Sequence, residues 1–160
     1  MKLYIKNKIF SWGGGSKVVD ENNNPVFIVK GKVFSPTRKK KICDLNGNVL
    51  FVVRNKWFNW FVHSAFVYDN EKNKIAKIKD KFFSVKGDFI VEGYQDEIMV
   101  DGKFLSFTSN IVRNGEVIGT IRRQITLIAD AFELEANEED MPFLIALIIA
   151  IDNIVDKKKK

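Results

Sequence analysis

Hydrophobic and polar positions alternate in short blocks over most of the chain, and this pattern changes only near the carboxyl end. Up to about residue 135, runs rich in Val, Ile and Phe are separated by polar segments rich in Asn, Asp and Gly. Such a pattern is typical of antiparallel hairpins, because Asn-Gly and Asp-Gly accept the positive φ values of tight hairpin turns. The runs predict twelve strands, near residues 2–6, 16–20, 26–31, 40–44, 48–54, 64–69, 75–79, 89–93, 97–100, 103–107, 117–122 and 130–135.

Alternation within these strands predicts which side chains face the interior. Phe27–Val29, Leu50–Val52 and Phe104 are expected to point inward, and Lys30, Arg54 and Lys103 outward. Three hairpins also resemble one another, with Asp20, Asp44 and Asp69 each followed by an Asn-rich turn. This similarity indicates either weak internal repetition or convergence on favourable turn chemistry.

A helix is predicted at the carboxyl end, where every residue from Met141 to Ile151 is apolar. Pro142 fits the first turn of a helix, and Asp140 can cap it. From about Asp140 to about Val155 the helix would be roughly 22–24 Å long, whereas a bilayer core is about 30 Å thick. The alternatives are a membrane tail anchor and a buried core helix, and the short length and the interruption at Asp152 favour the core helix.

A barrel of about twelve strands is too wide for its own side chains to fill. The apolar helix has the length and the surface to fill that space, as the central helix does in other wide barrels. We therefore expect a mainly β fold with one helix, a twelve-stranded antiparallel closed barrel around a central hydrophobic carboxyl-terminal helix. Residues 1–156 would form a single domain and residues 157–160 a basic tail.

The amino-terminal stretch and the cysteine content bear on the compartment. The first fifteen residues carry several lysines and contain no apolar run of signal-peptide length. Cys43 is the one cysteine, so it cannot form an internal disulfide, and a free buried thiol in a reducing compartment is expected. The sequence thus predicts a cytoplasmic protein without a transmembrane span, peripheral to a membrane if its basic residues bind one.

Charge is unevenly distributed along the chain. The formal net charge is +6, but residues 1–60 alone carry twelve Lys or Arg against three acidic residues, a balance of +9. Clustered positive charge concentrates polyanions such as phospholipid headgroups or nucleic acid. It also occurs in solvated loops and in edge strands protected by lysines. The candidate residues for binding an anion are Arg38, Lys39, Lys40, Lys41, Arg54, Lys56, Arg122 and Arg123.

Aromatic residues lie next to part of this basic set. Trp57, Phe58, Trp60 and Phe61 follow closely after Arg54. Aromatic side chains flanked by basic ones suit a membrane interface or unpaired nucleobases. A barrel strand with aromatic residues that line the interior would give the same sequence.

No assembled catalytic or metal-binding set is visible. His63 is the one histidine, and a single Cys with a single His does not make a zinc site. The glycines at 13–15 lack the Lys of a phosphate-binding loop, and the acidic run at 135–140 lacks calcium-loop spacing. We expect the acidic run to cap the helix, and Asp152 to lie in water or to meet a basic side chain. The sequence therefore predicts a protein that is not an enzyme and has no cofactor and no metal.

Several segments taken in order resemble those of the LURP-one-related proteins. They are the Lys-rich start KLYIKNKIFSW, the hairpins ICDLNGNV and FVYDNEKN, the FIVEG element at 89–93, and the closing TLIADAFELEANEEDMPFLIALIIAID. This family belongs to the Tubby carboxyl-terminal-domain-like group, with the phospholipid scramblases as further relatives. The resemblance implies a twelve-stranded barrel around a central hydrophobic helix. Tubby domains bind phosphoinositides through basic surface residues, but no motif here matches their site, so no residue role is carried over.

Three functions remain open at this point. The leading hypothesis is a non-enzymatic barrel that binds anionic phospholipid headgroups or a membrane surface. The alternative is a structural or protein-interaction module of unknown partner, whose charges serve solubility. Nucleic-acid binding is the third.

Overall fold

The computed structural model describes residues 1–6, 16–31, 35–57, 63–80, 89–101, 107–124 and 131–158. Within these residues it contains twelve strands, one 3-10 turn (η1) and one α-helix. Their bounds are β1 Lys2–Lys6, β2 Ser16–Val19, β3 Pro25–Gly31, β4 Lys40–Cys43, β5 Val49–Asn55, β6 Ser64–Tyr68, β7 Lys74–Asp80, β8 Phe89–Glu92, β9 Ile98–Asp101, β10 Thr108–Arg113, β11 Glu116–Gln124, β12 Ala131–Ala136, η1 Glu138–Asp140 and α1 Met141–Lys158.

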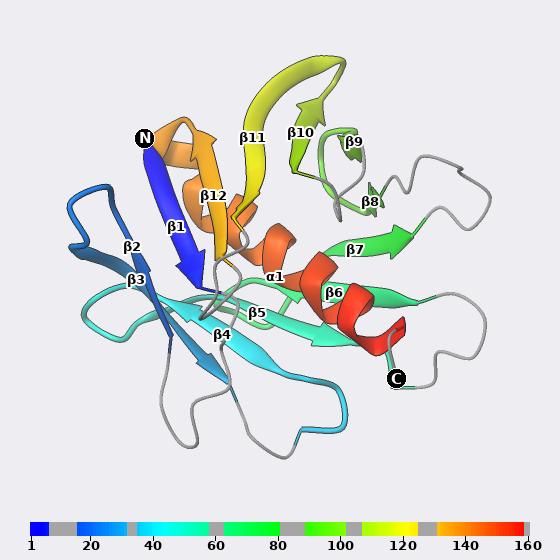
Figure 1. Cartoon of the computed structure of the whole chain (residues 1–160). Helices are drawn as coiled ribbons and strands as arrows, with labels where there is room; N and C mark the ends of the chain where they lie inside the picture. Colours follow the sequence, from blue (N-terminus) through cyan, green and yellow to red (C-terminus); the bar gives the residue numbers. More distant parts are fainter. Residues whose placement is uncertain are drawn as a thin grey trace.

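The strands form a closed antiparallel barrel (Figure 1). Each strand pairs with its neighbours along the chain, and the first strand closes the ring by pairing with the last, from Lys2 opposite Glu135 to Lys6 opposite Ala131. Closure leaves no strand edge exposed, which removes the main route by which β proteins aggregate. The predicted fold class is confirmed.

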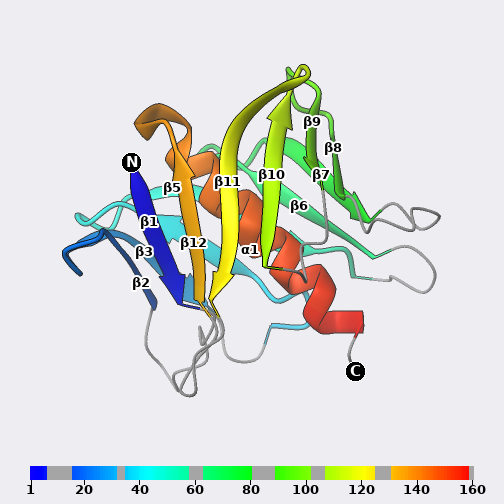
Figure 2. The ribbon, with the colours of Figure 1, turned by 45° about the horizontal axis from the view of Figure 1, so that its top comes forward.

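Helix α1 runs through the barrel (Figure 2). Its side chains from Phe143 to Val155 are buried, and those at 144–148 have no measurable exposure. The helix packs chiefly against β4 to β7. On the wall formed by β11 a glycine permits close approach, because a Cβ at Gly119 would lie 3.2 Å from Cδ1 of Leu144. The apolar helix is therefore the core, and no helix in the described part of the chain is long and apolar enough to cross a bilayer.

The two ends of the barrel differ in their connections. We name as the turn end the tight turns at 20–24, 44–48, 69–73, 93–97 and 113–116 together with residues 137–140, where α1 begins. We name as the tail end residues 35–39 and 56–57 together with the end of α1. In Figure 1 the amino terminus lies near the first of these ends and the carboxyl terminus at the second.

Three of the tight turns are built alike. The aspartates at 20, 44 and 69 each accept a backbone N–H at 2.8 Å from the asparagine four residues later. The side-chain amide of the same asparagine donates to the second carboxylate oxygen at 2.8–3.1 Å. The similarity of these hairpins thus extends to their hydrogen bonds.

The structure corrects three expectations. The tenth strand spans Thr108–Arg113 rather than 103–107; residues 103–106 lie outside the described part, and Phe107 is in a bend with 74% exposure. The inward face of β5 carries Phe51, Val53 and Asn55, so Leu50 and Val52 were assigned to the wrong face. Residues 49–53 are all apolar, so the sequence of β5 does not show which side chains alternate inward and outward. Asp140 directs its carboxylate to Arg113, an ion pair that the capping interpretation did not foresee.

Other orientations agree with the sequence. Val29 is buried and Phe27 packs partly against the core, while Lys30 and Arg54 are exposed. Cys43 is buried and forms no disulfide. Phe104, Lys103 and the glycines at 13–15 lie outside the described residues.

Candidate anion-binding site

Adjacent lysines on β4 point to opposite sides of the barrel wall. The side chain of Lys40 is turned inward and is 9% exposed, whereas Lys41 and Lys39 are exposed on the outside. The strand produces this arrangement, because successive side chains of an extended chain alternate between faces. The basic run therefore divides between the two sides of the wall.

The inward lysine belongs to a polar network at the tail end. The Lys40 ammonium lies 4.0 Å from a carboxylate oxygen of Asp152, itself 10% exposed, on α1. Nearby, the Asn55 side chain donates to the carbonyl of Asn153 at 3.2 Å, and the Asn153 side chain donates to the carbonyl of Arg38 at 3.2 Å. Asp152 thus meets a basic side chain, as predicted, and these contacts hold the end of the helix to the wall.

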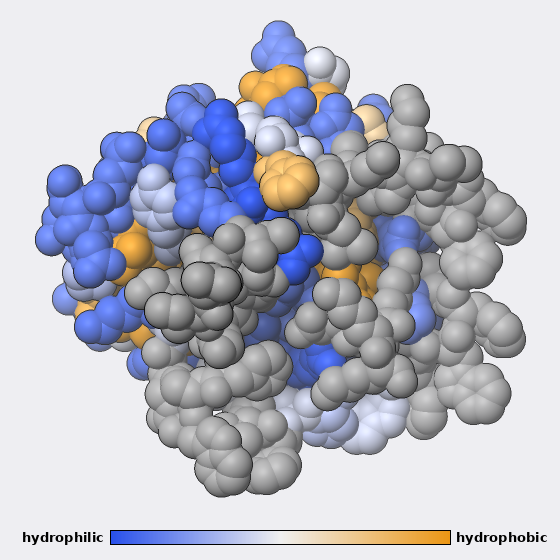
Figure 3. All heavy atoms as spheres, in the orientation of Figure 1, coloured by the Kyte–Doolittle hydropathy of each residue, from blue (hydrophilic) through white to orange (hydrophobic). Residues whose placement is uncertain are grey.

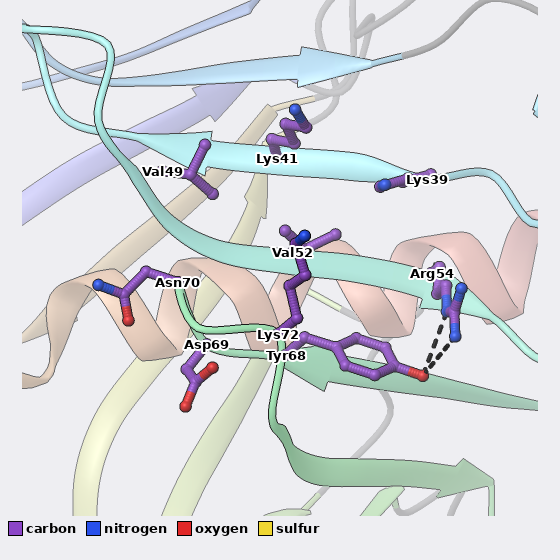
Figure 4. Close-up of a pocket in the computed structure, with 9 residues that line it drawn as sticks. All are labelled: Lys39, Lys41, Val49, Val52, Arg54, Tyr68, Asp69, Asn70 and Lys72. Atoms are coloured by element: carbon purple, nitrogen blue, oxygen red, sulfur yellow. Dashed lines mark hydrogen bonds between the residues drawn. The ribbon is translucent and has the colours of Figure 1, made fainter.

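The outward side chains surround a hollow of about 380 Å³ on the outer surface (Figure 4). It is lined by Lys39, Lys41, Val49, Val52, Arg54, Tyr68, Asp69, Asn70 and Lys72. Strand register explains the gathering, because Lys41 on β4 lies opposite Val52 on β5, which in turn lies opposite Tyr68 on β6. The basic side chains of the lining, together with its two valines, suit a ligand that has both an anionic group and an apolar part.

Arg54 is held in position by the ring beside it. Its Nε and Nη2 donate to the Tyr68 hydroxyl at 3.2 and 2.9 Å, and the guanidinium carbon lies 4.7 Å from the ring centroid. A neighbouring pair repeats this contact, with the Lys74 ammonium 5.2 Å from the Phe66 ring centroid. The hydroxyl accepts from Arg54 and keeps its own hydrogen for an incoming acceptor.

The four cations of the hollow have no carboxylate partner among the residues that the structure describes. Among the described residues, none of Lys39, Lys41, Arg54 and Lys72 forms an ion pair. The acid in the lining, Asp69, is occupied by its turn: hydrogen bonds from the Asn73 side chain and backbone lower the pKa of its carboxyl below 3.8. Among the described residues, the lining of the hollow therefore carries four cations against the single carboxylate of Asp69.

A further group of basic residues extends along the same wall. Burial lowers the pKa of the Lys77 ammonium, and the charges of Lys79 and Lys56 lower it further, against the raising effect of Glu92. Positive charge thus continues from the hollow across β7, although Lys79 is paired with Glu92 at 2.6 Å.

Comparison with known proteins agrees with this architecture. The model of the LURP-one-related family matches residues 1–152. The chain belongs to the LURP-one-related family. Among solved structures, the X-ray structure of a protein from Arabidopsis thaliana superimposes with a TM-score of 0.59 at 15% sequence identity, covering 94% of this chain and 90% of that chain. At such low identity the likeness shows the fold alone. No curated protein matches the chain.

The remaining predicted residues of this LURP-one-related barrel do not join the hollow. Arg122 lies on β11, six strands around the ring from β5, where it donates to Glu133 at 2.8 Å and to Glu135 at 3.1 Å. These hydrogen bonds raise the pKa of its guanidinium, the bond to Glu133 having the larger effect. Arg123 follows it on the same strand, and Lys56 is exposed just beyond the end of β5. Arg38 contacts the end of the helix, as described above.

Sequence reasoning missed two members of the site. Tyr68 was assigned to a strand and Lys72 to a turn, with no role for either. Lys72 has a positive φ of 71°, which places it in a tight turn. These two residues could be found only from the pairing register of β4, β5 and β6. Elsewhere in the described part of this LURP-one-related chain, no group of three or more His, Cys, Asp or Glu residues is arranged to hold a metal ion.

Proposed function

We propose that this LURP-one-related barrel is a non-enzymatic module that binds an anionic phospholipid surface through the outer face of β4 to β6. The observation that carries the proposal is the hollow whose four cations have no carboxylate partner in the described part of the chain. A lysine or arginine near an anionic membrane surface is attracted to it, and the attraction adds up over several residues. Elsewhere on the barrel, Arg113 and Arg122 are already paired with acids.

The composition of the hollow supports binding rather than catalysis. Its charged groups are Lys39, Lys41, Arg54 and Lys72, with Asp69 held by its own turn. Catalysis by acid and base needs a group that titrates near neutral pH beside a reacting atom. A cationic rim with an ordered arginine instead suits static recognition of phosphate oxygens. We place the protein in the cytoplasm, peripheral to a membrane.

Vesicle co-sedimentation tests the proposal. Wild-type protein should pellet with vesicles of phosphatidylcholine and phosphatidylserine, and should stay in the supernatant with phosphatidylcholine alone. The double variant Lys41→Gln/Arg54→Gln should pellet much less, because it removes two cations from the hollow. Raising the salt concentration should weaken binding, since exposed charges are screened.

A control matched in charge separates the site from the net charge. Lys17→Gln/Arg122→Gln loses the same two positive charges at exposed positions on β2 and β11. It should pellet like wild type, and thermal unfolding should confirm that both double variants are folded. Equal pelleting of wild type with both kinds of vesicle, or equal loss in both double variants, would contradict the proposal. Specific capture of a protein without lipid affinity would select the protein-interaction module instead.

A further inference from the structure

Among the described residues, the turns of the turn end are mainly acidic, whereas residues 35–39 and 56–57 of the tail end carry basic residues and no acidic one. The acidic residues of the turn end are Asp20, Glu21, Asp44, Asp69, Glu71, Asp96, Glu97, Glu116, Glu138, Glu139 and Asp140. Lys72 and Arg113 are the basic residues in these turns, and Arg113 is paired with Asp140 and Asp96. Figure 3 shows mainly hydrophilic side chains over β1, β2 and β12, toward this end.

In the described part of the tail end, residues 35–39 and 56–57 carry three basic side chains and an exposed indole. Arg38 and Lys39 precede β4, and Lys56 follows β5. Next to this lysine, Trp57 is 62% exposed. Helix α1 also finishes at this end. Tryptophan prefers the water–membrane interface, where its ring enters the headgroup region and its N–H stays hydrated.

We propose that the barrel docks on an anionic bilayer with its tail end and the nearest cations of the hollow, Lys39, Lys41 and Arg54, toward the lipid, and that Trp57 enters the headgroup region. This orientation rests on the proposed function. A strand of seven residues spans about 23 Å, whereas charges in physiological salt are screened within about 8 Å. Docking by the tail end therefore keeps most of the acidic turns outside the repulsive field. The turn at 69–73, which lines the far side of the hollow, carries Lys72 beside its two acids. The opposite orientation would press all the acidic turns against like charge.

The sequence offers a clean way to place reporters. Cys43 is the one cysteine and is buried, so a single introduced cysteine on the surface can be labelled selectively. Trp57→Cys reports on the tail end, and Val117→Cys on β11 reports on the turn end. The two positions are matched in exposure, at 62% and 60%. Lys56→Cys gives a second reporter at the tail end that keeps Trp57. Labelling of wild type under the same conditions measures any reaction of the buried thiol.

A nitrobenzoxadiazole label on these cysteines tests the orientation. On vesicles containing phosphatidylserine, emission from labels at 57 and 56 should rise, shift to shorter wavelength and be quenched by lipids with a spin label near the headgroup. Emission from the label at 117 should not change. A response at 117, or no response at 57 and 56 while the proteins pellet, would overturn the orientation and leave the proposed function standing. Failure of unlabelled wild type to pellet would overturn both.

Discussion

Lys40 and Lys41 are neighbours in the sequence, but their side chains point to opposite sides of the barrel wall. The first lies inside the barrel wall against Asp152 of the helix, and the second lies outside at the rim of the hollow. The inner face of this wall holds the helix in place, whereas the outer face presents four cations that form no ion pair with any described residue. The same residue type thus contacts the helix on one side and, in the proposed function, binds lipid on the other, and strand alternation decides which.

The contrast extends along the wall. On β5, Phe51 contacts the Phe143 ring of the helix inside, at a centroid distance of 6.0 Å. Asn55 also faces inward and bonds to the helix, while Arg54 between Val53 and Asn55 faces the hollow. Substitutions on the inner face should therefore change the free energy of unfolding, and substitutions on the outer face should change binding.

The largest effect is expected within the helix. Ile148 has no exposure, so Ile148→Asp would bury a charge without a partner. That cost should exceed the stability of a typical domain, about 5–15 kcal/mol. Circular dichroism and gel filtration should show an unfolded or aggregated chain. Ile148→Val should remain folded and lose about 0.5–1.5 kcal/mol. A folded, monodisperse Ile148→Asp protein would show that the helix is not the core.

The adjacent lysines give the next largest difference. Lys40→Met removes a partner of the buried Asp152 and should lower the free energy of unfolding by about 3 kcal/mol. Lys41→Met should change it by no more than about 0.5 kcal/mol, because that side chain is exposed. Urea denaturation of both variants measures the difference. Adding Asp152→Asn to Lys40→Met should recover part of the loss. Equal stability of the two methionine variants would remove the distinction between the faces.

Packing at Gly119 should give an intermediate effect. A valine there would crowd Leu144 and Ala136, whose nearest atoms already lie 3.2 and 3.4 Å from the position of a Cβ. Overpacking of this kind costs about 1–3 kcal/mol. Val117→Thr, at an exposed position on the same strand, is the control and should be nearly neutral. Thermal unfolding compares the two, and a Gly119→Val protein as stable as wild type would mean that α1 lies farther from β11.

The smallest effect should come from the exposed turns and should depend on pH. Hydrogen bonds from Asn48 hold the pKa of the Asp44 carboxyl below 3.8, and the bond from its side chain lowers this pKa most. Similar bonds act on Asp69, and on Asp20 the backbone bond from Asn24 dominates. Because these pKa values are lower in the folded chain than in the unfolded chain, their stabilisation is present above pH 3.8 and is lost as the pH falls through the folded values.

The triple variant Asp20→Ala/Asp44→Ala/Asp69→Ala tests this dependence. Its melting temperature should be below that of wild type at neutral pH, and the difference should shrink as the solution is acidified. A difference that stays constant down to the lowest pH at which the protein folds would show that the carboxylates stabilise the turns without the charge-dependent bonds.

Much of the fold could be predicted from the sequence because it depends on local signals. The apolar run at 141–151 and the Asn-rich turns specify a helix and hairpins without reference to the rest of the chain. The tenth strand was missed because Thr108, Ser109 and Asn110 are polar, although Ser109 and Ile111 face inward. The inward and outward positions of β5 were assigned wrongly. Its inward face includes a polar residue, Asn55, and only the hydrogen bond of this residue to the helix explains why it faces inward.

The site could be predicted only in part, because it depends on register between strands. Lys39, Lys41 and Arg54 were chosen for charge alone, and the structure brings them together. Charge alone also selected Lys40 and Arg122, which are paired with acids. Tyr68 and Lys72 could not be found, because nothing in the sequence states which residues lie opposite β5.

Amide chemical shifts on addition of phosphatidylserine bicelles would test most directly whether the outer face binds while the inner face holds the helix. The largest changes should fall on Lys39, Lys41, Arg54, Tyr68 and Lys72. Amides of the buried helix, from Phe143 to Ile151, and those around Arg122 on β11 should keep their positions. Changes centred on β11, or changes throughout the helix that show its release from the barrel, would contradict this division between the two faces.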